Sequence, residues 1–116
     1  MERGEVYLCS LNLPQRDGGA GGLRNKYVVI LQGGVNFATC TDVAVLVAST
    51  YNGQTVRAFE VVVGVAEGFD HDTVIDGRWP FTIGKSVVNA GQLKLKLDDL
   101  RMHEVSVAIG RGLQLR

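Results

Sequence analysis

The sequence has 116 residues, of which 46% are apolar, and twelve Lys or Arg residues balance twelve Asp or Glu residues. A chain of this length is expected to form one domain over residues 1–116, with a core that needs no disulfide or metal to hold it. A net charge of zero excludes a global attraction to nucleic acids or acidic membranes, so any nucleic-acid site must be a local patch.

The sequence shows neither a targeting signal nor a metal-binding motif. Residues Met1–Glu5 lack an apolar segment of the signal-peptide type, and no stretch approaches the ~20 apolar residues of a membrane span. Cys9 and Cys40 lie in separate apolar stretches without the paired spacing of metal or redox sites. We therefore expect a cytoplasmic protein with no membrane partner, two reduced core thiols, no metal and no cofactor.

Short apolar runs rich in β-branched residues recur along the chain, separated by turn residues that include many of the fifteen glycines. Six such runs in so short a chain predict a β-barrel or a compact sandwich. Several runs are apolar at nearly every position, which indicates strands covered on both faces and favours a homodimer. The predicted strands are Val6–Leu11, Tyr27–Leu31, Val43–Ala48, Ala58–Val65, Thr73–Ile75 and Phe81–Val88.

The longest predicted irregular segment runs from Asn12 to Asn25 and contains Gly18–Gly22 between Arg16 and Arg24. Loops of this length in small domains are usually functional or mobile. The segment lacks the Lys-Ser/Thr ending of a phosphate-binding P-loop, and no helix is expected after it, which argues against a nucleotide site.

The C-terminal part changes from strand to helix. Leu93–Leu97 alternates with a period of two, and Asp98 and Asp99 then supply an N-cap and a negative first turn. A helix is expected to follow and to end at Gly110 or Gly112. Its predicted apolar face contains Leu97, Leu100, Val105, Ala108, Ile109 and Leu113. The whole pattern predicts a mainly β fold, a β-barrel with a C-terminal α-helix.

Several blocks, in order, resemble the MazF/PemK (Kid-like) family of endoribonuclease toxins. Arg3–Leu8 is similar to the family's opening Arg-Gly-Glu-Ile/Val-aromatic strand, and Gly22–Gln32 to its Gly-x-Arg-Pro-Val-Val-Val-Leu/Ile-Gln segment. Further similar blocks are Val43–Thr50, Phe59–Val61 with Glu67–Gly68, Thr73–Ile75, Thr82–Ser86 and Gly91–Leu93. The resemblance implies a small Src-homology-3-like or CcdB-like barrel that dimerises and cuts single-stranded RNA, or mRNA, without metal. It also implies a cognate antitoxin protein that covers the RNA groove.

The resemblance implies a catalytic cation before the second strand and a hydroxyl at the end of the third. An ungapped match places Lys26 at the family's Arg, and a two-residue insertion places Arg24 there instead. We favour Arg24, because its planar fork suits phosphate. Ser49 matches the hydroxyl residue and Thr50 is the alternative; adjacent strand residues face opposite sides, so only one of them can point into the groove.

We further expect RNA contacts from Arg16, Arg78, Trp79 and Lys85. Arg78 and Trp79 replace the family's Asp-Gln pair, and an Arg beside an aromatic ring can stack a base and pair with a phosphate. Without the resemblance, Trp79 reads more readily as a half-buried core residue, and Arg24 and Lys26 as solvated charges.

Two other functions remain open on the sequence: a CcdB-like binder that poisons a topoisomerase, and an inactive family member that binds RNA or antitoxin without cutting. The two departures from the family's Arg-Pro and Asp-Gln motifs motivate the second. His71, between Asp70 and Asp72, is expected to be a surface-turn residue rather than a general base, and His103 a surface residue of the helix.

Overall fold

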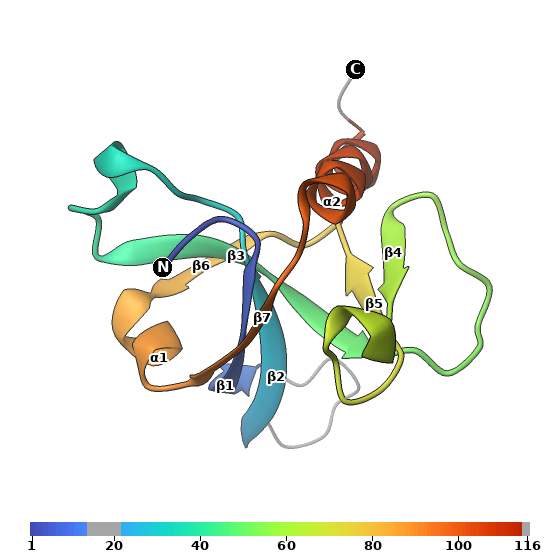
Figure 1. The fold of residues 1–116 in the computed structure, drawn as a ribbon, viewed down its shortest axis with the longest axis horizontal. Helices are drawn as coiled ribbons and strands as arrows, with labels where there is room; N and C mark the ends of the chain where they lie inside the picture. Colours follow the sequence, from blue (N-terminus) through green and yellow to red (C-terminus); the bar gives the residue numbers. More distant parts are fainter. Residues whose placement is uncertain (14–21, 115–116) are drawn as a thin grey trace.

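The computed structural model describes residues 1–13 and 22–114, and their elements follow one another as short strands that end in a helix (Figure 1). In chain order the elements are β1 (Glu5–Leu13), β2 (Gly22–Ile30), η1 (Val35–Phe37), β3 (Asp42–Thr50), β4 (Glu60–Val63), η2 (Val65–Glu67), β5 (Thr73–Asp76), β6 (Phe81–Gly84), α1 (Lys85–Asn89), β7 (Gln92–Lys96) and α2 (Asp99–Gly112).

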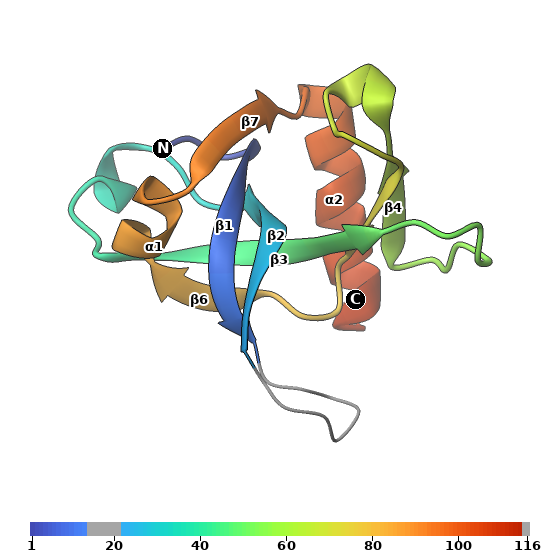
Figure 2. The same ribbon diagram turned by 90° about the horizontal axis from the view of Figure 1, so that it is seen from below.

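Within the described residues the seven strands form one curled antiparallel sheet in the order β4-β5-β3-β2-β1-β7, and β6 pairs with the first half of β3. α2 lies across β4 and β5, whereas α1 lies at the other end of the molecule, against β1 and β6 (Figures 1 and 2). The predicted mainly β barrel with a C-terminal helix is therefore confirmed. None of the helices in the described residues is long and apolar enough to span a membrane.

Two apolar cores, one on each face of the sheet, explain why β2 and β3 are apolar at nearly every position. Alternate residues of the two strands enter a core under α2 that includes Tyr27, Val29, Leu46 and Ala48. The intervening residues, such as Val28 and Val45, enter a second core with Phe37 and Val88. Both faces of these strands are thus covered within one chain, so the apolar pattern does not require a second subunit.

The predicted strand Phe81–Val88 is wrong in its second half, because the strand ends at Gly84 and α1 begins at Lys85. Val88 is fully buried in the second core, whereas Val87 is 37% exposed. The chain then passes close to β1: a Cβ on Gly91 would lie 2.5 Å from the Leu8 carbonyl oxygen. A side chain does not fit at this approach, and the short helix turns the chain towards it.

The predicted strand Ala58–Val65 is also shorter in the structure, where β4 covers Glu60–Val63.

The long irregular segment expected over residues 12–25 is also shorter than predicted. Asn12 and Leu13 belong to β1, and residues 22–25 belong to β2, where the two strands pair up to Leu13 and Gly22. The rest of the segment, with Arg16 and most of the glycine run, lies outside the described residues. Glycine and polar residues at these positions concealed strands that gain their stability from pairing rather than from propensity.

The C-terminal helix begins as predicted, with the Asp98 carboxylate accepting a hydrogen bond of 2.8 Å from the Arg101 backbone N–H. Its buried face differs from the prediction, because Leu100 is 67% exposed and Met102 is 4% exposed. The two residues lie about 200° apart around the helix, so a face centred on Met102 and Val105 turns Leu100 outwards. Leu113 is also exposed, at 47%.

The two cysteines are free, but they differ in burial. Cys9 is buried in the second core, where desolvation raises the pKa of its thiol. Cys40 is exposed after η1, so the expectation that both are core thiols is wrong for Cys40.

Candidate functional site

The ends of β2 and β3 bring together three of the predicted site residues. Tyr27 of β2 pairs with Ala48 of β3, so Lys26 and Ser49 each lie one residue beyond that pair. Lys26 continues the face of Val28, and Ser49 continues the face of Val47, which is the partner of Val28. Because strand residues alternate between faces, Lys26 and Ser49 share one face of the sheet, and Arg24 lies on that face two residues further along β2.

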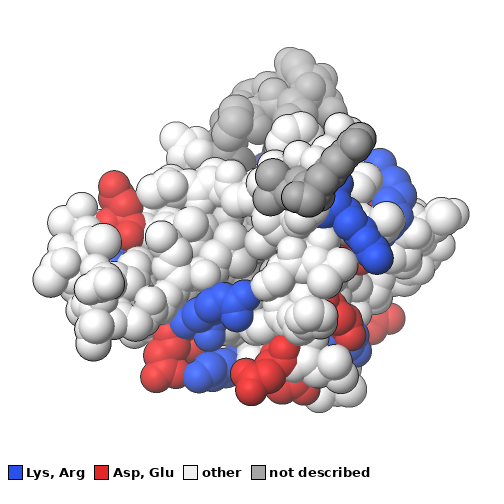
Figure 3. Space-filling view, turned by 90° about the horizontal axis from the view of Figure 1, so that it is seen from above, with Lys and Arg blue, Asp and Glu red and all other residues white. Residues whose placement is uncertain are grey.

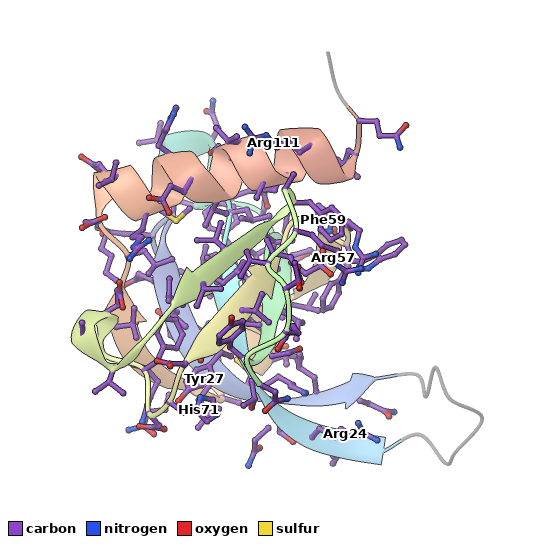
Figure 4. The ribbon with its side chains drawn as sticks, turned by 90° about the vertical axis from the view of Figure 1, so that its right-hand side faces the viewer. Arg24, Tyr27, Arg57, Phe59, His71 and Arg111 are labelled. Carbon is purple, nitrogen blue, oxygen red and sulfur yellow. The ribbon has the colours of Figure 1, made fainter. Side chains whose placement is uncertain are left out.

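Thr50 lies on the opposite face, with Tyr27 and Ala48. It pairs with Thr73 of β5, and its hydroxyl oxygen lies 3.3 Å from Nε2 of His71. Figure 4 shows His71 beside Tyr27, and the two rings meet edge to face with their centroids 6.1 Å apart. The two alternative hydroxyl residues are therefore separated by the sheet: Ser49 accompanies the cations, and Thr50 accompanies His71.

Two cations, Lys26 and Arg24, lie in this region. Lys26 is partly exposed and forms no hydrogen bond or ion pair with any residue in the described part of the chain. Arg24 is exposed, on the part of β2 that extends past the core (Figure 4). Arg16 belongs to the residues that the structure does not describe. Lys26 and Arg24 thus offer positive charge on the face that carries Ser49.

Tyr27 anchors the turn that carries His71. Its hydroxyl donates a hydrogen bond of 2.7 Å to the Asp70 carboxylate, and its ring packs edge to face on Phe69 with centroids 5.1 Å apart. Burial and the bond to Asp70 raise the pKa of Tyr27. The pKa of Asp70 lies below its ordinary value because it accepts this bond and because Lys94 of β7 lies 3.9 Å away. This network holds the backbone of the turn that contains His71 in place.

Arg78 and Trp79 lie in a second region, near the C-terminal end of α2, where a Cβ on Gly112 would lie 2.8 Å from the Arg78 backbone nitrogen. Figure 4 shows Arg57 and Phe59 below this half of the helix. The Arg78 guanidinium stacks over Phe59 at 4.3 Å and over Trp79 at 5.4 Å. It also donates three hydrogen bonds to the Asp76 carboxylate, the shortest of them 2.8 Å long. Burial raises the pKa of Asp76, but the bonds from Arg78 outweigh that effect and leave it below its ordinary value.

Trp79 is 52% exposed and belongs to neither core, so the structure does not support the core interpretation. Arg57 stacks over the same Phe59 ring at 4.8 Å and pairs with Glu60 at 3.2 Å. We refer to Arg57, Phe59, Arg78 and Trp79 as the arginine–aromatic cluster. Each arginine in it already has a carboxylate partner within the chain.

Lys85 is distant from both regions. Its ammonium donates a hydrogen bond of 2.6 Å to the Phe37 carbonyl and lies 3.7 Å from the centroid of the Phe37 ring. The preceding Gly84 pairs with Asp42 at the start of β3, whereas Ser49 is at its end. A strand of this length spans roughly 25 Å, and Figure 2 shows β3 crossing the molecule from the α1 end to the β4 end. The structure therefore does not bring Lys85 together with Lys26 and Ser49.

His71 contacts Thr50, one of the two candidate hydroxyl residues, although the sequence predicts only a surface-turn residue there. It is exposed and lies in a surface turn, as expected, but its imidazole contacts Thr50. The contact depends on the pairing of β3 with β5, which are separated by β4 and two loops in the sequence. No local pattern around His71 reports that pairing. His103 is exposed on α2, as predicted.

Figure 3 shows one face of the molecule, on which acidic and basic side chains alternate along one edge and much of the remaining surface is uncharged. Such interleaving produces no large field of one sign over this face.

Comparison by sequence finds no match among protein-family models or curated proteins. Comparison by structure finds similar solved structures. A mycobacterial endoribonuclease in complex with its cognate antitoxin is 18% identical over 100% of this chain and 97% of its own, with a TM-score of 0.73. The Mycobacterium tuberculosis toxin MazF-mt6 is 20% identical over 97% and 98% of the two chains, with a TM-score of 0.75.

A third similar structure is the MazE-MazF complex from Deinococcus radiodurans, 14% identical over 100% of this chain and 97% of the other, with a TM-score of 0.73. The likeness extends over the full length in all three cases, although few residues are shared. The chain therefore has the fold of the MazF toxins, as its resemblance to the MazF/PemK family predicts.

Proposed function

We propose that this protein is an endoribonuclease toxin that cuts single-stranded RNA without a metal ion and with sequence preference. The observation that carries the proposal is the shared face of Lys26, Arg24 and Ser49 at the ends of β2 and β3. The MazF fold and the endoribonuclease names of similar structures support it.

The chemistry requires few protein groups. The 2′-hydroxyl of the RNA attacks the neighbouring phosphate, so the protein must assist its deprotonation, stabilise the dianionic phosphorane and protonate the leaving 5′-oxygen. A cation stabilises the developing charge, and a hydroxyl donor holds a phosphate oxygen. Lys26 and Ser49 are a pair of this kind on adjacent strands.

The strand register favours Lys26 over Arg24 as the cation at the cut phosphate. Lys26 and Ser49 each lie one residue beyond the pair of Tyr27 and Ala48 in the antiparallel register, so they lie across from each other. Arg24 is two residues, or roughly 7 Å, further along β2. Arg24 then suits the next phosphate of the same RNA, where its fork makes two hydrogen bonds. This assignment reverses the preference that residue chemistry alone gave.

We also propose a cognate antitoxin as partner and a homodimer as the working form. Two of the similar structures contain an antitoxin by their names. Leu100, Val107 and Leu113 of the α2 region stay at least 37% exposed in the single chain, which leaves apolar surface for an interface. Light scattering at micromolar concentration checks the dimer, and a monomeric mass would contradict it.

The decisive experiment incubates purified, antitoxin-free protein with a long single-stranded RNA in EDTA. We expect cleavage at a limited set of sites, with 2′,3′-cyclic phosphate and 5′-hydroxyl ends, as attack by the 2′-hydroxyl requires. Lys26→Gln and Ser49→Ala serve as inactive controls from the same preparation. Intact RNA with folded wild-type protein would instead favour a member that binds RNA or antitoxin without cutting.

A further inference from the structure

His71 connects two hydroxyl groups through its two ring nitrogens. Its Nε2 lies 3.3 Å from the Thr50 hydroxyl oxygen, and its Nδ1 lies 3.2 Å from the Thr73 hydroxyl oxygen. Thr50 and His71 are exposed, whereas Thr73 is fully buried. The imidazole therefore has one nitrogen anchored in the protein and the other turned to an exposed hydroxyl.

The buried side of this chain determines which nitrogen of neutral His71 carries the proton. The Thr73 hydroxyl donates its single proton to the His71 carbonyl oxygen over 2.9 Å. The Thr73 oxygen can then only accept from Nδ1, so Nδ1 is protonated in the neutral ring. Nε2 is left as an acceptor, and the Thr50 hydroxyl donates to it. In this state Thr50 presents lone pairs rather than a proton to the solvent.

Protonation of the imidazole reverses the outer hydrogen bond. Both ring nitrogens of an imidazolium are donors, so Nε2–H donates to the Thr50 oxygen. The Thr50 proton is then free to donate to another acceptor, and the positive ring lies directly behind it. A group that offers a donor and a cation together is suited to an anionic oxygen.

We propose that Thr50 and His71 form a second phosphate subsite, in which His71 is a positioning residue that frees the Thr50 hydroxyl only when the imidazole is protonated. The inference rests on the proposed function, since its ligand is the phosphodiester of the same RNA strand next to the one cut at Ser49. Thr50 follows Ser49 directly at the end of β3 and faces the other side of the sheet. An RNA that passes around this strand end contacts both residues in succession.

The charged neighbours of His71 are compatible with a proton-dependent site. Asp70 precedes it, but its carboxylate is bonded to Tyr27 of β2 and lies near Lys94 of β7. Asp72 follows it, and its carboxylate lies beside Gly64, where an added Cβ would be 2.7 Å from Asp72 Oδ1. Neither carboxylate is bonded to the ring, whose two nitrogens contact only hydroxyl groups among the described residues. Protonation of the imidazole therefore changes the direction of the hydrogen bond between His71 and Thr50.

The test measures binding of a short mixed-sequence 2′-O-methyl oligoribonucleotide, which lacks the attacking hydroxyl, by fluorescence anisotropy across the pH range where imidazoles titrate. Binding that requires the protonated ring takes up a proton. The affinity of the wild type should therefore be highest at low pH and fall by up to about tenfold per pH unit as the ring loses its proton. Thr50→Val should bind more weakly and lose most of this pH response although His71 is retained. Thr50→Ser should restore the response.

The chain provides a matched control, since it has two histidines and the other, His103, lies on α2. His71→Gln should remove the pH response, whereas His103→Gln should keep it. A full pH response in Thr50→Val or in His71→Gln would overturn the inference. The cleavage assay separates it from the proposed function. Cleavage with no Thr50-dependent pH response overturns only the subsite, intact RNA with a Thr50-dependent pH response of binding overturns only the cleavage activity, and failure of the wild type both to cut RNA and to bind the oligonucleotide overturns both.

Discussion

The surface at the ends of β2 and β3 and the arginine–aromatic cluster both present cations, but their electrostatic states differ. Lys26 has no carboxylate partner among the residues that the structure describes, whereas Arg78 and Arg57 are paired with Asp76 and Glu60. A paired cation neutralises little additional charge, because its carboxylate already does so at short range. The first surface is therefore suited to a phosphate, and the cluster to the flat face of a base.

This difference cannot be read from residue type. Arg78 beside Trp79 suggests a combined phosphate and base contact in sequence, and Arg is the better phosphate ligand in general. The hydrogen bonds to Asp76 and the stack on Phe59 hold the Arg78 guanidinium in place, where it also stacks over the Trp79 ring. Two local contacts thus hold a candidate phosphate ligand against aromatic rings.

The largest expected effect separates the cations of the two regions. Lys26→Ala should lower the rate of RNA cleavage by about 10²–10³-fold, because it removes a preorganised charge from the phosphorane. Arg78→Ala should change that rate much less. Single-turnover cleavage at saturating protein measures both, and equal losses in the two variants would mean that the cations of the two regions do not differ in function.

Arg24→Ala belongs to the same experiment and tests whether Arg24 lies beyond the cut phosphate, as the strand register indicates. If Arg24 serves the next phosphate, its loss should weaken binding more than it slows the bound RNA. A loss of rate at saturation larger than that of Lys26→Ala would place Arg24 at the cut phosphate and restore the preference drawn from residue chemistry.

The second effect concerns the stacking platform. Trp79→Ala should weaken RNA binding by roughly 1–3 kcal/mol, the range of one base stacked on an aromatic side chain. Since Trp79 is half exposed and outside both cores, the melting temperature should change little. Binding and thermal unfolding of the same preparation give the answer. Unchanged binding, or a collapse of stability, would show that the ring serves the fold instead.

The third prediction removes the carboxylate that pairs with Arg78. Asp76→Asn keeps an oxygen that can accept the 2.9 Å bond from the Arg78 backbone N–H, but it removes the charge that neutralises the guanidinium. Arg78 then becomes available to phosphate, so RNA binding should tighten at low salt. The slope of log affinity against log salt should steepen by about 0.7, the value for one added contact to single-stranded RNA. An unchanged slope would mean that RNA does not reach Arg78.

Much of the fold follows from patterns that are local in the sequence. Strands such as Val43–Ala48 and the Asp98 cap are recognisable because alternation, β-branching and capping act over a few neighbouring residues. The errors are nonlocal in origin. Residues 22–25 form a strand because they pair with β1, and Lys85–Asn89 turn into a helix because Val88 packs in the second core.

The candidate site could likewise be predicted only in part from the sequence. Lys26, Arg24 and Ser49 could be named from a family resemblance, because motif residues keep their order along the chain. Which face each occupies, and the partner that Thr50 finds in His71, depend on how β2, β3 and β5 pair. The state of Arg78 depends on Asp76, only two residues away, but sequence alone does not show that the turn closes on itself.

The smallest expected effect tests whether the scaffold and the RNA surface respond to different pH ranges. Glu67 accepts a 2.7 Å bond from the Gly64 backbone N–H and pairs with Arg101 of α2 at 2.7 Å, and these contacts hold its pKa below the ordinary 4.5. A lowered pKa in the folded state stabilises the protein above pH 4.5, and this contribution is lost as the pH falls through the folded value. Glu67→Gln should therefore lower the free energy of unfolding at neutral pH by roughly 1 kcal/mol, since the pair is partly exposed. The difference from wild type should shrink in acid, as urea unfolding at several pH values can measure. Near neutral pH this difference should stay constant, because a carboxyl group with a lowered pKa is already ionised there, and a change would mean that the pH response of RNA binding reflects the scaffold rather than Thr50.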